Sequence, residues 1–160
     1  MAPVQVGDTL PSEDLFEDSP ATKVNIAEFV SGKKVVLFAV PGAFTPGCSK
    51  THLPGYVQNA DKMKADGVGE DAHSVSINDP YVMAAWDAQH NTKGKVRMLA
   101  DPNRNFIKAL NLGTNLRPLG GFRSKRFSMV IYDGKFQELN VEPDGTGLSS
   151  SLVDKIKYKN

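Results

Sequence analysis

Cys48 is the only cysteine in the chain, and it ends the segment Pro41-Gly42-Ala43-Phe44-Thr45-Pro46-Gly47-Cys48. This segment follows an apolar run, and Pro46 is a favourable first residue for a helix. A thiol at a helix start meets backbone N–H groups and the positive end of the helix dipole, which both favour the reactive thiolate. Thr45 adds a hydroxyl, and Gly47 lets backbone N–H groups approach an incoming oxygen. The pattern predicts a thiol-based enzyme.

Other interpretations of Cys48 remain open from these residues alone. A lone cysteine is often a small buried apolar residue without reactivity. Cys48 and His52 are also four residues apart on the expected helix, a spacing found among metal ligands. No second pair of ligands is available, since only His73 and His90 remain and no other cysteine exists. We therefore expect no metal, and we place His52 at the rim of the site or on the surface.

The elements that position this segment follow from hydrophobic patterns. Val35–Val40 is apolar at every position, which is typical of a strand buried on both faces of a sheet. Between the loop and Gly67, apolar residues recur at the spacing of a helix. They are Leu53, Tyr56, Val57, Ala60 and Met63. We expect a strand, a loop and a helix in this order.

The remaining elements are predicted from caps, turns and apolar runs. They are an extended piece at Asp14–Glu17, a short helix at 26–30 capped by Asn25, a strand at His73–Ile77, a helix opened by Asp79-Pro80 with Tyr81, Val82, Ala85 and Trp86 as its apolar stripe, a strand at Val96–Ala100, a helix from Asp101 to about Leu110, a hairpin of Arg126–Tyr132 and Phe136–Val141 around Asp133-Gly134, and a last helix from Ser149 to about Ile156. This order predicts an α/β thioredoxin-like fold, a central mixed sheet flanked by helices, as one domain over residues 1–160.

Composition excludes several classes of function. The 160 residues carry 19 basic and 18 acidic side chains, so a net charge of +1 gives no general attraction to nucleic acid or to an anionic membrane. One cysteine cannot build a disulfide framework. The N-terminus lacks the pattern of a secretory signal, and no apolar run is long enough to span a bilayer. We expect a cytoplasmic protein, although a removed transit peptide of an organellar form would leave no trace in this sequence.

The Pro41–Cys48 segment resembles the P-x-x-x-T/S-x-x-C motif of the peroxiredoxins, and the longer stretch Val40–Gly55 is similar to their type II, or peroxiredoxin-5, subfamily. The similarity continues through further segments. They are Ser76–Pro80, Leu99–Pro102, Arg123–Ser128 and Asn140–Gly147. The resemblance therefore covers nearly the whole chain.

This resemblance implies a thioredoxin-like fold and a peroxidase that reduces hydrogen peroxide and alkyl hydroperoxides. It assigns catalysis to Cys48, Thr45 and Arg126, and it places Pro41 and Gly47 at the substrate. Arg126 would supply the cation that favours the thiolate and would hold a peroxide oxygen. Cys48 would become a sulfenic acid, with no metal or organic cofactor.

The chain departs from many relatives in lacking a resolving cysteine. The equivalent positions are Ser74 and Ser150, so either this is a natural one-cysteine enzyme or serine has replaced that cysteine. Sulfenic acid would be reduced from outside, by glutathione with glutaredoxin, by thioredoxin, or through a disulfide between two Cys48 residues. The resemblance also implies a homodimer, and Phe44 would either contribute to its interface or pack within its own chain. A redox sensor or relay with little bulk turnover is the alternative function.

Overall fold

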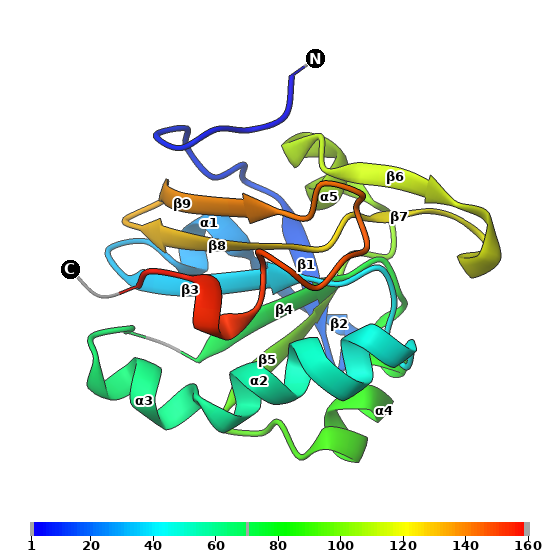
Figure 1. The fold of residues 1–160 in the computed structure, drawn as a ribbon, viewed down its shortest axis with the longest axis horizontal. Helices are drawn as coiled ribbons and strands as arrows, with labels where there is room; N and C mark the ends of the chain where they lie inside the picture. Colours follow the sequence, from blue (N-terminus) through cyan, green and yellow to red (C-terminus); the bar gives the residue numbers. More distant parts are fainter. Residues whose placement is uncertain (1, 70, 159–160) are drawn as a thin grey trace.

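A seven-stranded mixed sheet with the order β2-β1-β5-β4-β3-β8-β9 forms the centre of the computed structural model, which describes residues 2–69 and 71–158 (Figure 1). Its strands are β1 Asp14–Glu17, β2 Ser19–Asn25, β3 Lys34–Ala39, β4 Ala72–Ser76, β5 Val96–Ala100, β8 Phe127–Tyr132 and β9 Lys135–Val141. A separate hairpin joins β6 Gly113–Leu116 to β7 Gly121–Ser124. The helices are α1 Ile26–Phe29, α2 Leu53–Gln58, α3 Ala60–Ala65, α4 Pro80–His90 and α5 Asn105–Leu110.

Strand β3 lies inside the sheet, between β4 and β8, and all its residues are buried. Side chains alternate across a strand, so Val35, Leu37 and Ala39 enter one core while Val36 and Phe38 enter the other. The unbroken apolar run in the sequence is thus explained, because helices and loops cover both faces of the sheet.

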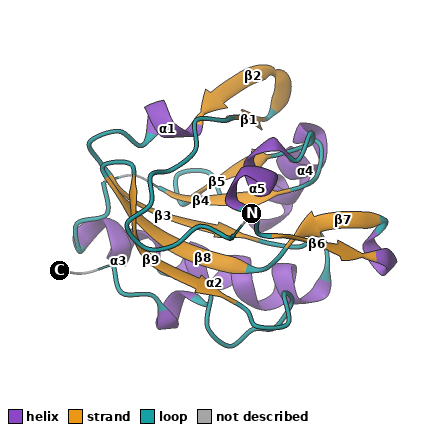
Figure 2. Cartoon of the chain, turned by 90° about the horizontal axis from the view of Figure 1, so that it is seen from above, coloured by secondary structure: helices purple, strands orange, loops and turns teal. Residues whose placement is uncertain are grey.

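The two cores have different helices. Residues of α2, α3 and α4 pack on the face that carries Phe38, and these helices lie together on one side of the sheet in Figure 1. Residues of α1 and α5 pack on the opposite face. Seen from above, the β6–β7 hairpin extends away from the main sheet (Figure 2). The predicted mixed sheet flanked by helices is confirmed.

The pairing of β3 with its neighbours brings distant residues to one end of the sheet. β3 runs parallel to β4 and antiparallel to β8, and Ala39 pairs with Phe127. Because the antiparallel strand begins where β3 ends, the residue before β8 lies beside the loop after β3. That residue is Arg126.

Most of the predicted local signals are confirmed. Asp79 caps α4 by accepting hydrogen bonds from the N–H groups of Tyr81 and Val82. Asn25 caps α1 in the same way through the Glu28 N–H. Asp133 and Gly134 both have positive φ, as a tight type I′ hairpin turn requires.

Three predictions about helices were wrong in detail. Tyr81 and Ala85 are exposed on α4, and Met83 is buried with Trp86 instead. The long helix after the loop breaks at Asn59 into α2 and α3. The third helix begins at Asn105 and not at Asp101, whose carboxylate accepts the N–H groups of residues 106 and 107.

The predicted last helix over residues 149–156 is absent apart from a short 3-10 turn at Val153–Lys155. Its serines do not cap a helix, since their N–H groups bind the carboxylate of Glu142. The β6–β7 hairpin and strand β2 were not predicted, because their residues alternate weakly and β2 is mostly exposed. Within the described residues no helix is both long and apolar enough to cross a membrane.

Candidate active site

Cys48 lies at the first turn of the helix that follows β3, and its side chain is fully buried. The Ser49 N–H donates to the Thr45 carbonyl over 2.9 Å, so the N–H groups of Gly47 and Cys48 precede that first helical bond. Cys48–His52 forms a π-helical turn before α2, a local widening that occurs often at functional sites. The predicted position of Cys48 at a helix start is confirmed.

The loop before Cys48 is held from two sides. The Thr45 hydroxyl donates to the Gly42 carbonyl over 2.7 Å, and the Ala43 N–H donates to the side chain of Asn78 over 3.0 Å. A hydroxyl has one proton and two lone pairs, so Thr45 keeps lone pairs to accept a hydrogen bond from a bound molecule. Pro41 is buried where the loop leaves the sheet.

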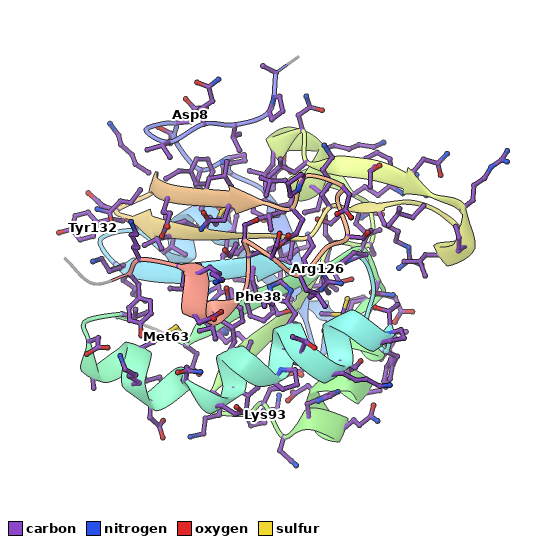
Figure 3. All side chains as sticks on the ribbon, in the orientation of Figure 1. Asp8, Phe38, Met63, Lys93, Arg126 and Tyr132 are labelled. Carbon is purple, nitrogen blue, oxygen red and sulfur yellow. The ribbon has the colours of Figure 1, made fainter. Side chains whose placement is uncertain are left out.

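Arg126 lies against the same turn, although 78 residues separate it from Cys48 in the sequence. A Cβ added to Gly47 would lie 3.1 Å from Nη2 of Arg126, so glycine lets the guanidinium approach the backbone next to Cys48. Arg126 is only 4% exposed, and Figure 3 shows it between the sheet and helix α2. The expected pairing of the cation with this turn thus has a geometric basis.

Two acceptors fix the orientation of the guanidinium. Nε of Arg126 donates to the Thr146 carbonyl over 3.2 Å, and Nη1 lies 3.1 Å from Nδ1 of His52. An arginine is always protonated, so His52 Nδ1 must be the acceptor in this second contact. The proton of the imidazole is then on Nε2, which donates to the Ser151 carbonyl over 3.1 Å.

The prediction that His52 lies at the rim or surface was wrong. Its side chain is fully buried, 4.9 Å from the ring of Phe38 and 5.5 Å from that of Tyr56, measured between ring centroids. Burial and the positive charge of Arg126 lower the pKa of His52 to about 3. The imidazole is therefore neutral at ordinary pH and can accept from Arg126.

A buried carboxylate holds the segment that faces His52. Glu142 is 1% exposed, and it accepts hydrogen bonds from the N–H groups of Ser149, Ser150 and Ser151 at 2.7–2.9 Å. The hydroxyls of Ser149 and Ser151 donate to it as well, each over 2.6 Å. Burial alone raises the pKa of Glu142, but these bonds outweigh it and lower the pKa to about 2. Glu142 is thus an anion.

Trp86, the only tryptophan, is a further contact of this turn that the sequence did not indicate. Its indole N–H donates to the hydroxyl of Ser49, the residue after Cys48, over 3.0 Å. Trp86 is fully buried on α4. Its fluorescence is therefore a convenient reporter of changes at Cys48.

Ser74 and Ser150, the residues at the predicted resolving positions, differ in their burial. Ser74 is fully buried in the middle of β4, and Ser150 is half-buried in the segment that Glu142 holds. Among the residues described, no group of three or more His, Cys, Asp or Glu side chains could hold a metal ion. Both ring nitrogens of His52 are already engaged, by Arg126 and Ser151.

Comparisons with known proteins identify relatives of this chain. The Redoxin family model matches residues 5–156. Peroxiredoxin-2C of Oryza sativa subsp. japonica is 44% identical over 98% of this chain and 99% of its own length. The structure of reduced Prx3 from Vibrio vulnificus in complex with hydrogen peroxide has a TM-score of 0.89 at 43% identity, over 95% of this chain and 96% of that chain.

A second similar structure is peroxiredoxin 5 from Alvinella pompejana, with a TM-score of 0.81 at 39% identity, covering 90% of this chain and 93% of that chain. The chain therefore belongs to the Redoxin family. Within that family it is a peroxiredoxin of type II, a thiol peroxidase with one cysteine in its chain. The predicted thioredoxin-like fold and the predicted family are both confirmed.

Burial of neutral His52 predicts a specific acid sensitivity of the fold. The pKa of His52 is about 3 in the folded protein and near 6.5 when unfolded, so below pH 6.5 the unfolded state binds the extra proton and stability falls. Between pH 7 and pH 5 this contributes a loss of about 2 kcal/mol to the free energy of unfolding. Urea titrations of the wild type and His52→Phe should show that the variant lacks this loss.

Tyr56→Phe is a matched control for this experiment. The Tyr56 hydroxyl donates to the same Ser151 carbonyl over 2.9 Å, and burial raises the pKa of Tyr56 further above its ordinary value, so it does not titrate between pH 5 and pH 7. The control should keep the pH dependence of the wild type. Equal pH dependence in His52→Phe and the wild type would contradict the assignment.

Proposed function

We propose that this peroxiredoxin reduces hydrogen peroxide and alkyl hydroperoxides through a sulfenic acid at Cys48, and that an external thiol recycles it. The observation that carries the proposal is the packing of buried Arg126 against Gly47, at the turn that bears the only cysteine. The similar Prx3 of Vibrio vulnificus has hydrogen peroxide in its structure, which supports the same substrate class here.

In the proposed reaction the Cys48 thiolate attacks one peroxide oxygen in line with the O–O bond. A sulfur–oxygen bond forms and the O–O bond breaks, so that sulfur loses two electrons and the departing oxygen gains them. Arg126 and the N–H groups of the helix start stabilise the charge on the oxygens, while Thr45 Oγ1 accepts a hydrogen bond from the peroxide O–H and orients it. The attacked oxygen keeps its hydrogen and becomes part of the sulfenic acid, and the departing oxygen takes a proton from solvent and leaves as water or an alcohol. Pro41 and Gly47 shape the backbone around the substrate.

An apolar rim supports the inclusion of alkyl hydroperoxides. Phe44, with φ of +64° in the left-handed region, is 49% exposed within the loop before Cys48. Leu148 is 38% exposed, and its Cδ1 would lie 3.4 Å from a Cβ on Gly47. Large exposed apolar side chains beside a reactive group suit an alkyl substituent.

Return of the enzyme to its reduced form requires thiols from outside the chain. One thiol condenses with the sulfenic acid to a mixed disulfide and releases water, and a second thiol then displaces the Cys48 sulfur. Because Cys48 is fully buried, a thiol the size of glutathione reaches the sulfur only when the first helical turn opens. Glutathione with glutaredoxin, or thioredoxin, is the proposed donor.

We also propose a homodimer and a cytoplasmic location. Exposed Phe44 and Tyr81 supply apolar surface for a second copy of the chain. A reducing compartment keeps a catalytic thiol available for its reductant. The same type of protein also occurs elsewhere, since peroxiredoxin-2E of Arabidopsis thaliana, 39% identical over 98% of this chain, is named chloroplastic.

Cys48→Ser should abolish peroxide consumption, because serine cannot form a sulfenic acid. The test is loss of peroxide in the presence of excess thiol, with the fold checked by circular dichroism. Ser74→Ala, which alters a buried serine at a predicted resolving position, is the control and should remain active. Activity retained in Cys48→Ser would place the chemistry on another residue.

Thr45→Val should slow oxidation of Cys48 by hydrogen peroxide by about tenfold, because it removes the hydroxyl but keeps the shape of the side chain. Thr45→Ser keeps the hydroxyl and should stay within about threefold of the wild type. Trp86 fluorescence in a stopped-flow instrument gives the second-order rate constant for each variant. Equal rates for the valine variant and the wild type would remove Thr45 from the mechanism.

The chain lacks a resolving cysteine, so the sulfenic acid has to be reduced by a thiol from outside. We therefore expect multiple turnovers with a glutathione–glutaredoxin system or with thioredoxin. The measurement is peroxide consumed per protein with each donor at fixed peroxide, together with mass spectrometry of the Cys48 adducts. If no donor supports more than one equivalent of peroxide, the sensor or relay function replaces the enzyme with bulk turnover.

A further inference from the structure

Glu142, the residue after β9, binds a loop that reaches the active site from the far end of the chain. Both carboxylate oxygens are occupied by donors from the consecutive residues Ser149, Ser150 and Ser151. Gly147 permits this tight return, because a Cβ there would lie 3.3 Å from Oε1 of Glu142. We call these four residues, Glu142 and Ser149–Ser151, the carboxylate clamp.

The clamp fixes the direction of one carbonyl group. Because its N–H and its hydroxyl both donate to Glu142, Ser151 is held with its carbonyl facing the helix that follows Cys48. This carbonyl accepts from Nε2 of His52 and from the hydroxyl of Tyr56. Ser151 is fully buried, so these contacts have no competition from water.

The direction of that carbonyl sets the state of His52. A neutral imidazole donates from one nitrogen and accepts at the other, so a carbonyl at Nε2 leaves a lone pair at Nδ1. Nδ1 receives the Arg126 guanidinium at 3.1 Å. The opposite tautomer would place two N–H groups against each other and would push Arg126 away from this position.

The clamp is also a costly way to hold a loop. Removing a carboxylate from water is expensive even when it is well bonded, and neutral groups hold loops at lower cost. The charge of Glu142 suggests a second role, because Arg126, the buried cation of the site, is linked to it. The link runs from Arg126 to His52, from His52 to the Ser151 carbonyl, and from Ser151 to Glu142. The clamp therefore does more than fix the chain end.

We propose that Glu142 is a positioning residue for peroxide reduction: through Ser151 and His52 it fixes the guanidinium of Arg126 against the turn that bears Cys48. Glu142 touches neither the substrate nor the sulfur in this role. The inference rests on the function proposed above, because the role of Arg126 at the peroxide is part of that function.

Glu142→Gln is the test, because the amide keeps the shape of the side chain but replaces an acceptor oxygen by a donor. We expect oxidation of Cys48 by hydrogen peroxide to slow by about tenfold, since small displacements of a positioned group are costly to rate. Alkylation of Cys48 by iodoacetamide, measured at a pH high enough to ionise the thiol fully in both proteins, should stay within about twofold, since it needs no oxygen held by Arg126. Trp86 fluorescence and mass spectrometry supply the two rates.

Glu138→Gln is the matched control. Glu138 is a carboxylate on the same strand, β9, and it accepts the Lys157 N–H over 2.6 Å without contacting the clamp serines. Its peroxide rate should equal that of the wild type. If Glu142 only stabilised the fold, Glu142→Gln would expose buried Cys48 and accelerate alkylation, and this outcome would overturn the proposal.

A double-mutant cycle tests the route through His52. In a His52→Phe background, Glu142→Gln should change the peroxide rate by less than about twofold, because the link to Arg126 is already broken. A full tenfold loss in that background would show that Glu142 acts by another route and would also overturn the proposal. If the wild type does not react with peroxide, the proposed function itself is wrong. If the wild type reacts and Glu142→Gln reacts at the same rate, only this inference is wrong.

Discussion

The burial of the Arg126 guanidinium is the constraint on which the site depends. A charge that is 4% exposed must find partners within the protein, and here these are the Thr146 carbonyl and the lone pair of His52. His52 is itself fixed by the Ser151 carbonyl, and Ser151 is fixed by Glu142. A chain of hydrogen bonds therefore runs from Arg126 to the C-terminal segment. The cost of one buried cation thus organises residues from three distant parts of the sequence.

Sheet topology makes that burial useful. Antiparallel pairing of β3 with β8, with Ala39 opposite Phe127, fixes Arg126 at the level of the loop that leads to Cys48. A shift of one residue would turn the side chains of β8 to the wrong faces of the sheet, and both faces are buried. Hydrophobic packing of the two cores therefore sets the register, and the register sets the distance between cation and thiol.

Elements with strong local signals were predictable because their cause is local. The apolar run of β3, the Asp79 cap and the Asp133-Gly134 turn depend on a few adjacent residues, and each was found where expected. The helix predicted from Ser149 did not form, because the backbone N–H groups of Ser149, Ser150 and Ser151 donate to the Glu142 carboxylate and do not serve as the first N–H groups of a helix. The stripe on α4 failed because apolar residues are spread around this helix, so that their spacing does not define a single face.

By itself the sequence determined the family, the thioredoxin-like fold and the candidate catalytic set of Cys48, Thr45 and Arg126, since these follow from two segments that resemble the peroxiredoxins, Pro41–Cys48 and Arg123–Ser128, and from strong local patterns. Only the tertiary structure decided that His52 is buried, neutral and bonded to Arg126, and that Glu142 holds the segment behind it. The physical reason is that a tautomer and a buried hydrogen bond are chosen by partners that meet in space, and no spacing along the chain encodes such partners.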